Sequence, residues 1–312
     1  MAGYTFRPAV REQVGLLIGL IGPSGGGKTY TAMRLASGIV GPGKRFAVID
    51  TEARRSLHYA GMFDFDMCEL HPPFRPEAYA EAIKTAEAAG YAAIVVDSYS
   101  HEWAGEGGIL DWQEEELTRM AGDSYGKREA CKMAAWIKPK MSHKKMVQHL
   151  LQVKATLILC FRAEEKVKME KDAQNKTVIV PQGWQPICSK ELPYELTVSF
   201  LLTPDKPGFP QPIKLQEQHK SLFPLNVPIT EESGKLVAEW AAGGVIKEAP
   251  KTITPEQNKR LRTLITGNKI DANVFKSHFG IESSLDLLAS KMDEAEKWIT
   301  EQTQEREPGQ DG

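Results

Sequence analysis

The sequence has few cysteines, no long apolar run and almost no net charge, and each absence excludes something. The four cysteines among 312 residues are far apart and form no C-x-x-C pair, so neither a zinc site nor a disulfide framework is indicated. Nowhere do about eighteen apolar residues run together, and the first residues lack the apolar core of a secretory signal. We therefore expect a cytoplasmic protein that is neither secreted nor embedded in a membrane. The formal net charge of -2 means that nucleic-acid binding would need a local basic patch.

Glycine, in contrast, is concentrated in one segment between residues 22 and 29. The segment reads Gly22, Pro23, Ser24, Gly25, Gly26, Gly27, Lys28 and Thr29, and it fits the pattern G-x-x-x-x-G-K-[ST] at every fixed position. An apolar run of strand length, 14–21, precedes it and a helical pattern, 30–40, follows it, which is the context that the pattern requires. We expect these residues, with Tyr30, to bind a nucleoside triphosphate. A glycine-rich turn without a ligand is the alternative.

Each residue type in this segment has a chemical role. Glycines adopt positive φ and turn backbone N–H groups toward phosphate oxygens. Lys28 adds a charge that reaches the β- and γ-phosphates, and Thr29 supplies a hydroxyl for the metal ion. ATP and Mg²⁺ are therefore the expected ligands, with Lys28 also stabilising the transition state.

Two further apolar runs end in acidic residues. Residues 45–50 read as a buried strand that leads into Glu52, and residues 91–96 as a strand that ends at Asp97. Polar residues at the carboxyl ends of parallel strands point into the ligand crevice of an open α/β sheet, so both side chains are expected near the phosphates. Four apolar residues closed by an aspartate form the Walker B pattern, in which Asp97 holds Mg²⁺. A helix-capping role is the alternative for Asp97.

The following segments extend this α/β pattern. A helix is expected at 141–152 and a strand at 153–161, which leads into Arg162. Arg162 lies where a side chain can sense the γ-phosphate, and a solvated arginine is the alternative. Segments rich in β-branched and aromatic residues predict antiparallel strands that extend the sheet, and a final helix closes the domain. The strands are 166–180, 194–202 and 213–216, and the helix is 231–242.

The succession GPSGGGKT, FAVIDTE and AAIVVDS resembles, in order and spacing, the ATPase core of RecA-type recombinases. It looks most like the short RecA-like P-loop proteins of bacteriophages, described as nucleotide-binding or AAA-family proteins, some of which are grouped with single-strand annealing proteins. The resemblance spans residues 14–242 and implies an α/β fold with a RecA-like core sheet flanked by helices. In that family a glutamate after the second strand activates the attacking water, and Glu52 is the matching position. A loop carboxylate or helix cap is the alternative for Glu52.

The resemblance also implies a function. A phage RecA-like protein would hydrolyse ATP in DNA recombination, single-strand annealing or repair, in the cytoplasm of a bacterial host. Its partners would be single-stranded DNA, single-strand-binding or other recombination proteins, and further copies of the chain. Recombinases carry Asn-Gln where this sequence has Phe161 and Arg162, so we expect a different link, or none, between γ-phosphate sensing and DNA binding. A nucleotide-dependent assembly or replication accessory factor is the rival interpretation. A small-molecule kinase is a third, without an evident acceptor site or arginine-rich lid.

Positive charge is concentrated after the Walker B strand. Residues 127–145 hold seven lysines and arginines against Glu129 alone, with a tryptophan among them. Cations that contact phosphates, next to an aromatic ring on which bases stack, suit single-stranded nucleic acid. The predicted contacts are Trp136, Lys138, Lys140, Lys144 and Lys145. An ordinary solvated helix face with a core tryptophan is the alternative.

The chain changes character after Gly244. A composition of 41% hydrophobic and 26% charged residues allows one large domain, 1–244, and something smaller. A linker, 245–254, leads to a small helical module, 255–300, and then to a polar tail, 301–312, predicted to be disordered. The module loosely resembles the C-terminal appendage of several phage recombination and annealing proteins. A packing cap on the ATPase domain is the alternative.

Overall fold

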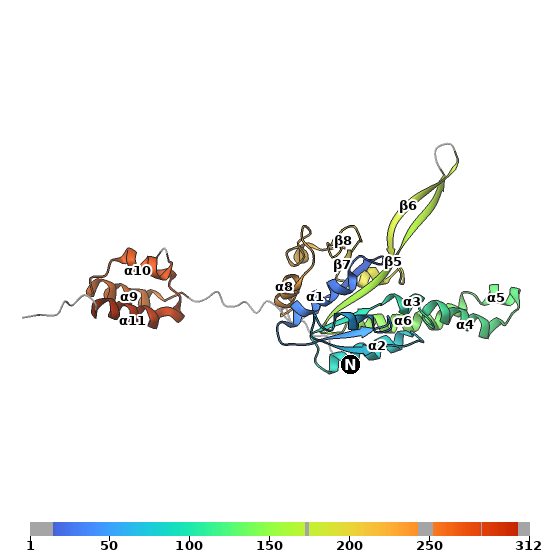
Figure 1. Cartoon of the computed structure of the whole chain (residues 1–312), viewed down its shortest axis with the longest axis horizontal. Coiled ribbons are helices and arrows are strands. Elements are labelled where there is room, and N and C mark those ends of the chain that lie inside the picture. Colours follow the sequence, from blue (N-terminus) through green and yellow to red (C-terminus); the bar gives the residue numbers. More distant parts are fainter. Residues whose placement is uncertain (1–14, 172–174, 243–251, 282, 305–312) are drawn as a thin grey trace, which may run out of the picture. The chain divides into compact units, whose positions relative to one another are not determined.

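The computed structural model describes residues 15–171, 175–242, 252–281 and 283–304, and it divides the chain into two compact units (Figure 1). The first unit is Met1–Gly244 and the second is Val245–Gly312. Two apolar clusters form the core of the first unit, and a third cluster forms the core of the second.

An eight-stranded sheet lies at the centre of the first unit, in the order β3-β2-β4-β5-β1-β7-β8, with β6 paired to β5 outside this path. The strands are β1 (Leu17–Gly22), β2 (Phe46–Asp50), β3 (Phe65–Glu69), β4 (Ala93–Asp97), β5 (Thr156–Lys171), β6 (Thr177–Pro186), β7 (Val198–Leu201) and β8 (Gln211–Lys214). All pairings between neighbours from β3 to β7 are parallel, and β8 is antiparallel to β7. The predicted α/β fold with a parallel core sheet is confirmed.

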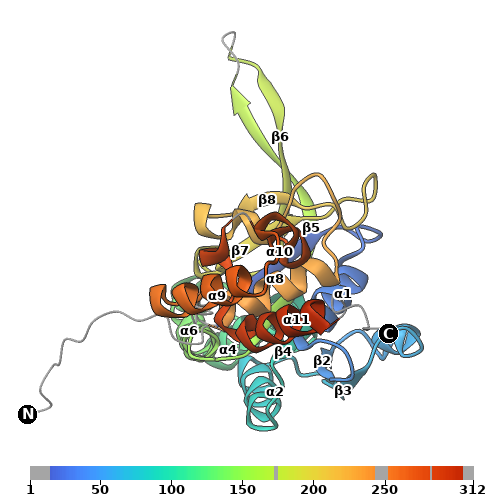
Figure 2. The ribbon, with the colours of Figure 1, turned by 90° about the vertical axis from the view of Figure 1, so that its left-hand side faces the viewer.

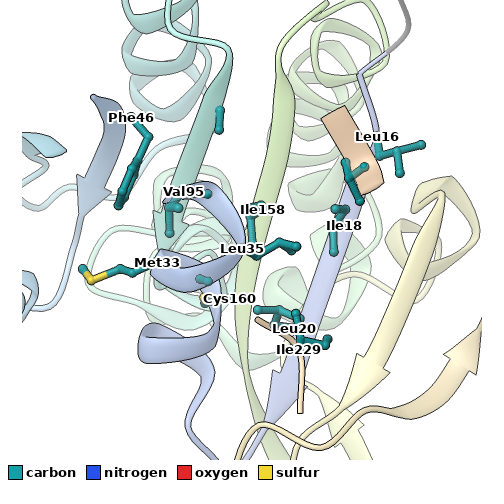
Figure 3. Packing of buried hydrophobic residues seen from close by; sticks show 14 of the residues in the cluster. Leu16, Ile18, Leu20, Met33, Leu35, Phe46, Val95, Ile158, Cys160 and Ile229 are labelled. Atoms are coloured by element: carbon teal, nitrogen blue, oxygen red, sulfur yellow. The ribbon is translucent and has the colours of Figure 1, made fainter. Parts of the chain in front are cut away.

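Helices cover both faces of this sheet, which is why β1, β2 and β4 are buried along their whole length. The helices of this unit are α1 (Lys28–Val40), α2 (Pro76–Ala88), α3 (Ser100–Ala104), α4 (Ile109–Ala121), α5 (Tyr125–Cys131), α6 (Ile137–Leu150), α7 (Leu192–Glu195) and α8 (Glu231–Ala241), with 3-10 turns η1 (Arg55–Tyr59), η2 (Ala134–Trp136) and η3 (Glu217–Leu222). On one face α1 and α8 pack on the sheet; Figure 3 shows Met33 and Leu35 of α1 near Val95 and Ile158 of the central strands. On the other face, α2 and α6 pack through a second cluster that includes Ile83 and Met146.

Two glycines allow α1 and α8 to approach closely. A Cβ atom at Gly38 would collide with the backbone of Glu231, and one at Gly234 would collide with the carbonyl of Leu35. Arg34 of α1 forms an ion pair of 2.6 Å with Glu231 at the start of α8. Helix α8 therefore lies on α1, the helix that begins at the glycine-rich segment.

The structure differs from the sequence predictions at three places in this unit. Strand β3 was not predicted, because its polar Asp66 and exposed Cys68 interrupt the apolar pattern. The strand predicted at 153–161 continues as β5 to Lys171, where it has left the main sheet and pairs with β6 as a two-stranded hairpin (Figure 1). The single strand predicted at 166–180 is therefore wrong: this range holds the end of β5 and the start of β6. Segment 194–202 contains β7, which pairs parallel to β1; the predicted antiparallel orientation is wrong there, and holds for β8 and for the pair of β5 and β6.

The second unit is a small helical module around an apolar core, whose fully buried members include Leu261, Phe275 and Ala295. Its helices are α9 (Pro255–Gly267), α10 (Ala272–Phe279) and α11 (Met292–Gln304), with 3-10 turns η4 (Ser284–Asp286) and η5 (Ala289–Lys291). Thr254 caps α9 through a capping box with Gln257. Because α11 continues to Gln304, the prediction of disorder from residue 301 is wrong for 301–304; the rest of the tail, 305–312, and most of the predicted linker lie outside the described residues. None of the described helices is long and apolar enough to span a membrane.

Candidate functional site

The glycine-rich segment forms a tight loop between β1 and α1. Gly25 and Gly27 both have φ of 83°, a conformation that other residues rarely adopt. A Cβ atom at Gly22 or Gly26 would collide with the carbonyl oxygen of Leu202, so the loop packs directly on the chain that follows β7. Since α1 begins at Lys28, the N–H groups of its first turn face the loop and create a site for an anion.

This loop borders a cavity of about 730 Å³ at the carboxyl ends of the central strands. Its walls come from the loop, from the ends of β2, β4 and β5, and from η1. The lining residues are Gly22, Pro23, Ser24, Gly25, Gly27, Lys28, Thr29, Tyr30, Asp50, Glu52, Arg55, Ser56, His58, Tyr59, Asp97, Arg162, Ala163 and Ile187. Every residue predicted for nucleotide binding, metal binding and hydrolysis therefore lines one cavity, apart from Gly26, which lies behind the loop against Leu202.

Lys28 lies in the cavity as a partly buried cation. Its Nζ donates a hydrogen bond of 2.8 Å to the carbonyl oxygen of Pro23 in the same loop. Burial lowers the pKa of Lys28 below its ordinary value of 10.5, while the nearby carboxylates of Asp97 and Glu52 act in the opposite direction. The side chain thus lies across the loop, where an entering phosphate can replace the carbonyl as its partner.

Thr29 and Asp97 form the oxygen cluster predicted to hold the metal ion. The Thr29 hydroxyl donates a hydrogen bond of 2.5 Å to Oδ2 of Asp97. Burial raises the pKa of Asp97 to about 6, and the hydrogen bond from Thr29 opposes this shift. A hydroxyl and a carboxylate are hard oxygen ligands, and Mg²⁺ takes few protein ligands when phosphates and water complete its octahedron. The donor set therefore fits Mg²⁺ bound together with a nucleotide.

Glu52 follows β2 and is held between two arginines. Its Oε1 accepts hydrogen bonds from Nε and Nη2 of Arg162, at 3.0 and 2.8 Å, and its Oε2 accepts one of 3.0 Å from Arg55. Burial alone would raise the pKa of Glu52, but the hydrogen bonds and charge of Arg162 outweigh it and lower the pKa. Glu52 is therefore ionised at neutral pH, and the guanidinium of Arg162 is hydrogen-bonded to its carboxylate.

Asp50 positions the loop that carries Glu52. One of its carboxylate oxygens accepts a hydrogen bond of 2.7 Å from the backbone N–H of Glu52, and the other accepts one of 2.9 Å from the N–H of Ser56. Thr51 contacts the segment that follows β4. Its hydroxyl donates a hydrogen bond to the carbonyl of Ser98 and lies 2.8 Å from Nδ1 of His101. Burial lowers the pKa of His101, so the imidazole is neutral near pH 7. This network links the segments that follow β2 and β4.

Sequence reasoning missed the wall that η1 contributes. Arg55, His58 and Tyr59 line the cavity, and the ring of Tyr59 lies 6.0 Å from that of Tyr30. The signal available was the run of polar and aromatic residues after the second strand, which on its own is typical of a loop. Aromatic rings at the edge of a phosphate cavity provide an apolar surface on which a nucleotide base can stack.

The residues predicted to contact DNA lie together but away from this cavity. Trp136 stacks on Trp103 at 6.2 Å, and the ammonium group of Lys140 lies 5.3 Å from the Trp136 ring. Lys138 forms an ion pair of 3.1 Å with Glu116 of α4. Lys144 and Lys145 are exposed on α6 beside each other. The acidic helix α4 thus neutralises part of the basic segment, and Trp136 is half-buried.

Similarity to known proteins consists of one family match and distant structural likenesses. The model of a family described as AAA domain matches residues 15–202. No curated protein matches the chain. Among solved structures, a KaiC-like protein from the hyperthermophilic archaeon Pyrococcus horikoshii OT3 is 14% identical, with 58% of this chain and 90% of that chain covered and a TM-score of 0.27. The assembled ATPase EscN from the type III secretion system of enteropathogenic E. coli is 13% identical, with 94% and 72% covered and a TM-score of 0.34.

Proposed function

Because the chain belongs to the AAA-domain family, which covers residues 15–202 and gives it a nucleotide-binding P-loop ATPase domain, we propose that it hydrolyses ATP with Mg²⁺. The observation that carries this proposal is the position and ionisation of Glu52. An ionised carboxylate lies in the same cavity as the phosphate-binding loop, at the tip of the strand next to the one that ends in Asp97.

The residues of the cavity divide the work of hydrolysis. Lys28 and the N–H groups of the loop bind the β- and γ-phosphates and stabilise charge that develops on them. Thr29 and Asp97 would hold Mg²⁺, which neutralises phosphate charge when it is bound. Glu52 orients the attacking water and accepts its proton. Arg162 leaves Glu52 for the γ-phosphate, and this exchange frees the carboxylate only when a triphosphate is present.

Turnover measurements test this proposal directly. Purified protein should release phosphate from ATP in a Mg²⁺-dependent way, and the rate should rise when single-stranded DNA is added. If the protein binds nucleotide but releases no phosphate in the presence of Mg²⁺, the ATPase assignment is contradicted. The protein would then bind nucleotide without hydrolysing it.

We further propose that the chain acts on single-stranded DNA in phage-type recombination, annealing or repair. Support comes from α6, where Lys140, Lys144 and Lys145 are exposed and Lys140 lies over the Trp136 ring. Each phosphate neutralised on a single strand contributes a slope of about -0.7 in log affinity against log salt. Replacing these three lysines with alanine should therefore flatten the slope by about two units.

Two control variants sharpen the DNA experiment. Lys138→Ala should change the slope less, because this lysine is already paired with Glu116, a carboxylate that Arg119 also binds. Lys220→Ala with Lys235→Ala, on η3 and α8 and outside the basic segment, should leave the slope unchanged. If wild-type protein shows no salt-dependent DNA binding with ATP present, the partial neutralisation of the basic segment by α4 favours the alternative, a nucleotide-dependent assembly or replication accessory factor.

A further inference from the structure

An apolar groove of about 590 Å³ lies at one edge of the main sheet, away from the nucleotide cavity. Its floor is formed by β2 and β3, and its wall by α2. The lining residues are mostly small or apolar: Ala47, Val48, Ile49, Met67, Cys68, Leu70, Ala78, Ala82, Thr85, Ala86, Ala89 and Tyr91. Asp66 and Glu81 are the charged residues among the lining, and both are acidic.

The groove runs beside an open strand edge. Strand β3 ends the sheet and, within the described residues, pairs with β2 on one side. Its other side therefore presents backbone N–H and C=O groups to a further strand, although the carbonyl of Phe65 in β3 already accepts a hydrogen bond from the side chain of Arg45. A sheet binds an added strand through two features: main-chain hydrogen bonds along the edge strand, and pockets that receive every second side chain of the added strand. The five-residue edge strand β3 offers the first feature, and the apolar groove beside it offers the second.

The β5–β6 hairpin carries a matching apolar face. Its register pairs Met169 with Ile179 and Val167 with Pro181, so all four side chains lie on the same face of the ribbon. Val167, Met169 and Ile179 are 57%, 72% and 64% exposed. A two-stranded ribbon with an apolar face is only marginally stable in water, which indicates that this face packs on a partner.

Charge agrees with a match between the two surfaces. The apolar face of the hairpin also carries Lys171 opposite Thr177, and no acidic residue belongs to this face between 167 and 171 or between 177 and 181. The lining of the groove contains two acidic residues, Asp66 and Glu81, and no basic one. Asp66 is already paired with Arg45 at 2.9 Å and accepts a hydrogen bond of 2.7 Å from Tyr91, so Glu81 is the carboxylate that can meet Lys171.

A chain does not place its own hairpin in its own groove. The hairpin leaves the sheet from β5, which β4 and β2 separate from β3. Figure 2 shows β6 rising on the side opposite to β2 and β3. The two surfaces can therefore meet only between different molecules.

We propose that the groove binds the β5–β6 hairpin of a second copy of this chain, with residues 177–181 of β6 added to the free edge of β3. Because each copy offers a groove at one place and a hairpin at another, the contact is head-to-tail and continues from copy to copy. Residues Arg162, Ala163 and Ile187 at the root of the hairpin line the nucleotide cavity, so the docked arm begins at the cavity of the copy that donates it.

Mixing two variants tests this contact. The hairpin variant is Met169→Asp with Ile179→Asp, and the groove variant is Ala82→Glu. Wild-type chain should form oligomers whose mass, by light scattering without nucleotide, rises with concentration. Each variant alone should associate at least about 100-fold more weakly, because it places carboxylates in an apolar contact. An equimolar mixture should give a dimer and nothing larger, since one good hairpin and one good groove remain.

Matched controls place the charge elsewhere on the same elements. Lys168→Asp with Val180→Asp puts the same pair on the opposite face of the ribbon, and Lys84→Glu puts an acid on α2 outside the groove. Both should keep the wild-type mass. A monomeric wild type, a single variant of wild-type mass, or a mixture that stays monomeric would each overturn the proposal. Loss of DNA binding by the hairpin variant with its mass unchanged would also overturn it.

Cysteine labelling provides a measurement on the unaltered groove. Cys68 is exposed in the groove of one copy and should be covered by the hairpin of the next. In assembled wild-type protein it should react with a maleimide at least about 10-fold more slowly than in the hairpin variant, by mass spectrometry. Cys131 on α5 serves as the reference thiol in both proteins. Equal labelling rates of Cys68 in the two proteins would contradict the docking.

Discussion

Single residues in the cavity have separable roles, and Lys28 is the one on which nucleotide affinity depends most directly. Lys28→Ala removes the cation that lies across the phosphate-binding loop, so we expect ATP affinity to fall at least about 100-fold and phosphate release to become undetectable. Isothermal calorimetry measures the affinity. Lys44→Ala, on the exposed turn after α1, is the control and should bind ATP normally. Unchanged affinity of Lys28→Ala would refute the assignment of the loop.

Glu52→Gln separates binding from chemistry. The amide keeps the size of the side chain but accepts no proton from water, so turnover should fall by about 10²- to 10⁴-fold while ATP affinity stays within about 2-fold. Steady-state kinetics and calorimetry on the same preparation measure both. Glu69→Gln, on the edge strand outside the cavity, should leave turnover unchanged. A wild-type rate for Glu52→Gln would mean that Glu52 only positions Arg162 and Arg55.

Arg162→Ala tests the contact that lowers the pKa of Glu52. Removal of this guanidinium takes away two hydrogen bonds and a positive charge, so the pKa of Glu52 should rise. Because Glu52 accepts a proton only when ionised, the acidic limb of the pH profile of kcat/KM, which reports the free enzyme, should move to higher pH. Lys166→Ala, on the same strand beyond the cavity, should not move that limb. An unshifted profile with a reduced maximal rate would instead indicate that Arg162 acts on the phosphate alone.

At the scale of elements, the contact between α1 and α8 depends on two glycines. Gly234→Ala gains helix propensity, but its methyl group collides with the carbonyl of Leu35, so we expect a net loss of about 1 to 3 kcal/mol in unfolding free energy. Urea denaturation measures it. Gly126→Ala in α5 is the control: its Cβ meets no neighbour, and it should be neutral or stabilising. A stable Gly234→Ala would show that α8 can move away from α1 without cost.

At the scale of the whole molecule, the two compact units have separate cores. A chain that ends at Gly244 should bind ATP with unchanged affinity, because every residue that lines the cavity lies before that point. Full-length protein should show two unfolding transitions by calorimetry, and the shortened chain should lack one of them. A single cooperative transition that loses both units together would contradict this division.

The sequence by itself determined the parts whose signal is local. The loop from Gly22 to Thr29, the strands before Glu52 and Asp97, and the capped start of α9 each depend on residue types at fixed spacing. Such patterns work because a phosphate loop needs glycines with positive φ, and because a buried parallel strand must be apolar along its whole length. The α/β fold followed from the order of these elements.

Only the tertiary structure decided what depends on distant segments. Arg162 and Glu52 are 110 positions apart, and their contact exists because β4 lies between β2 and β5 and aligns the ends of all three strands. Acidic α4 folds against the basic segment and neutralises Lys138, which a count of local charge could not reveal. Strand β3 escaped detection because an edge strand needs no continuous apolar run, and the groove beside it arises from residues that three separate elements contribute. Spacing along a chain records local geometry, whereas pairing between strands and helices is set by how the whole core packs.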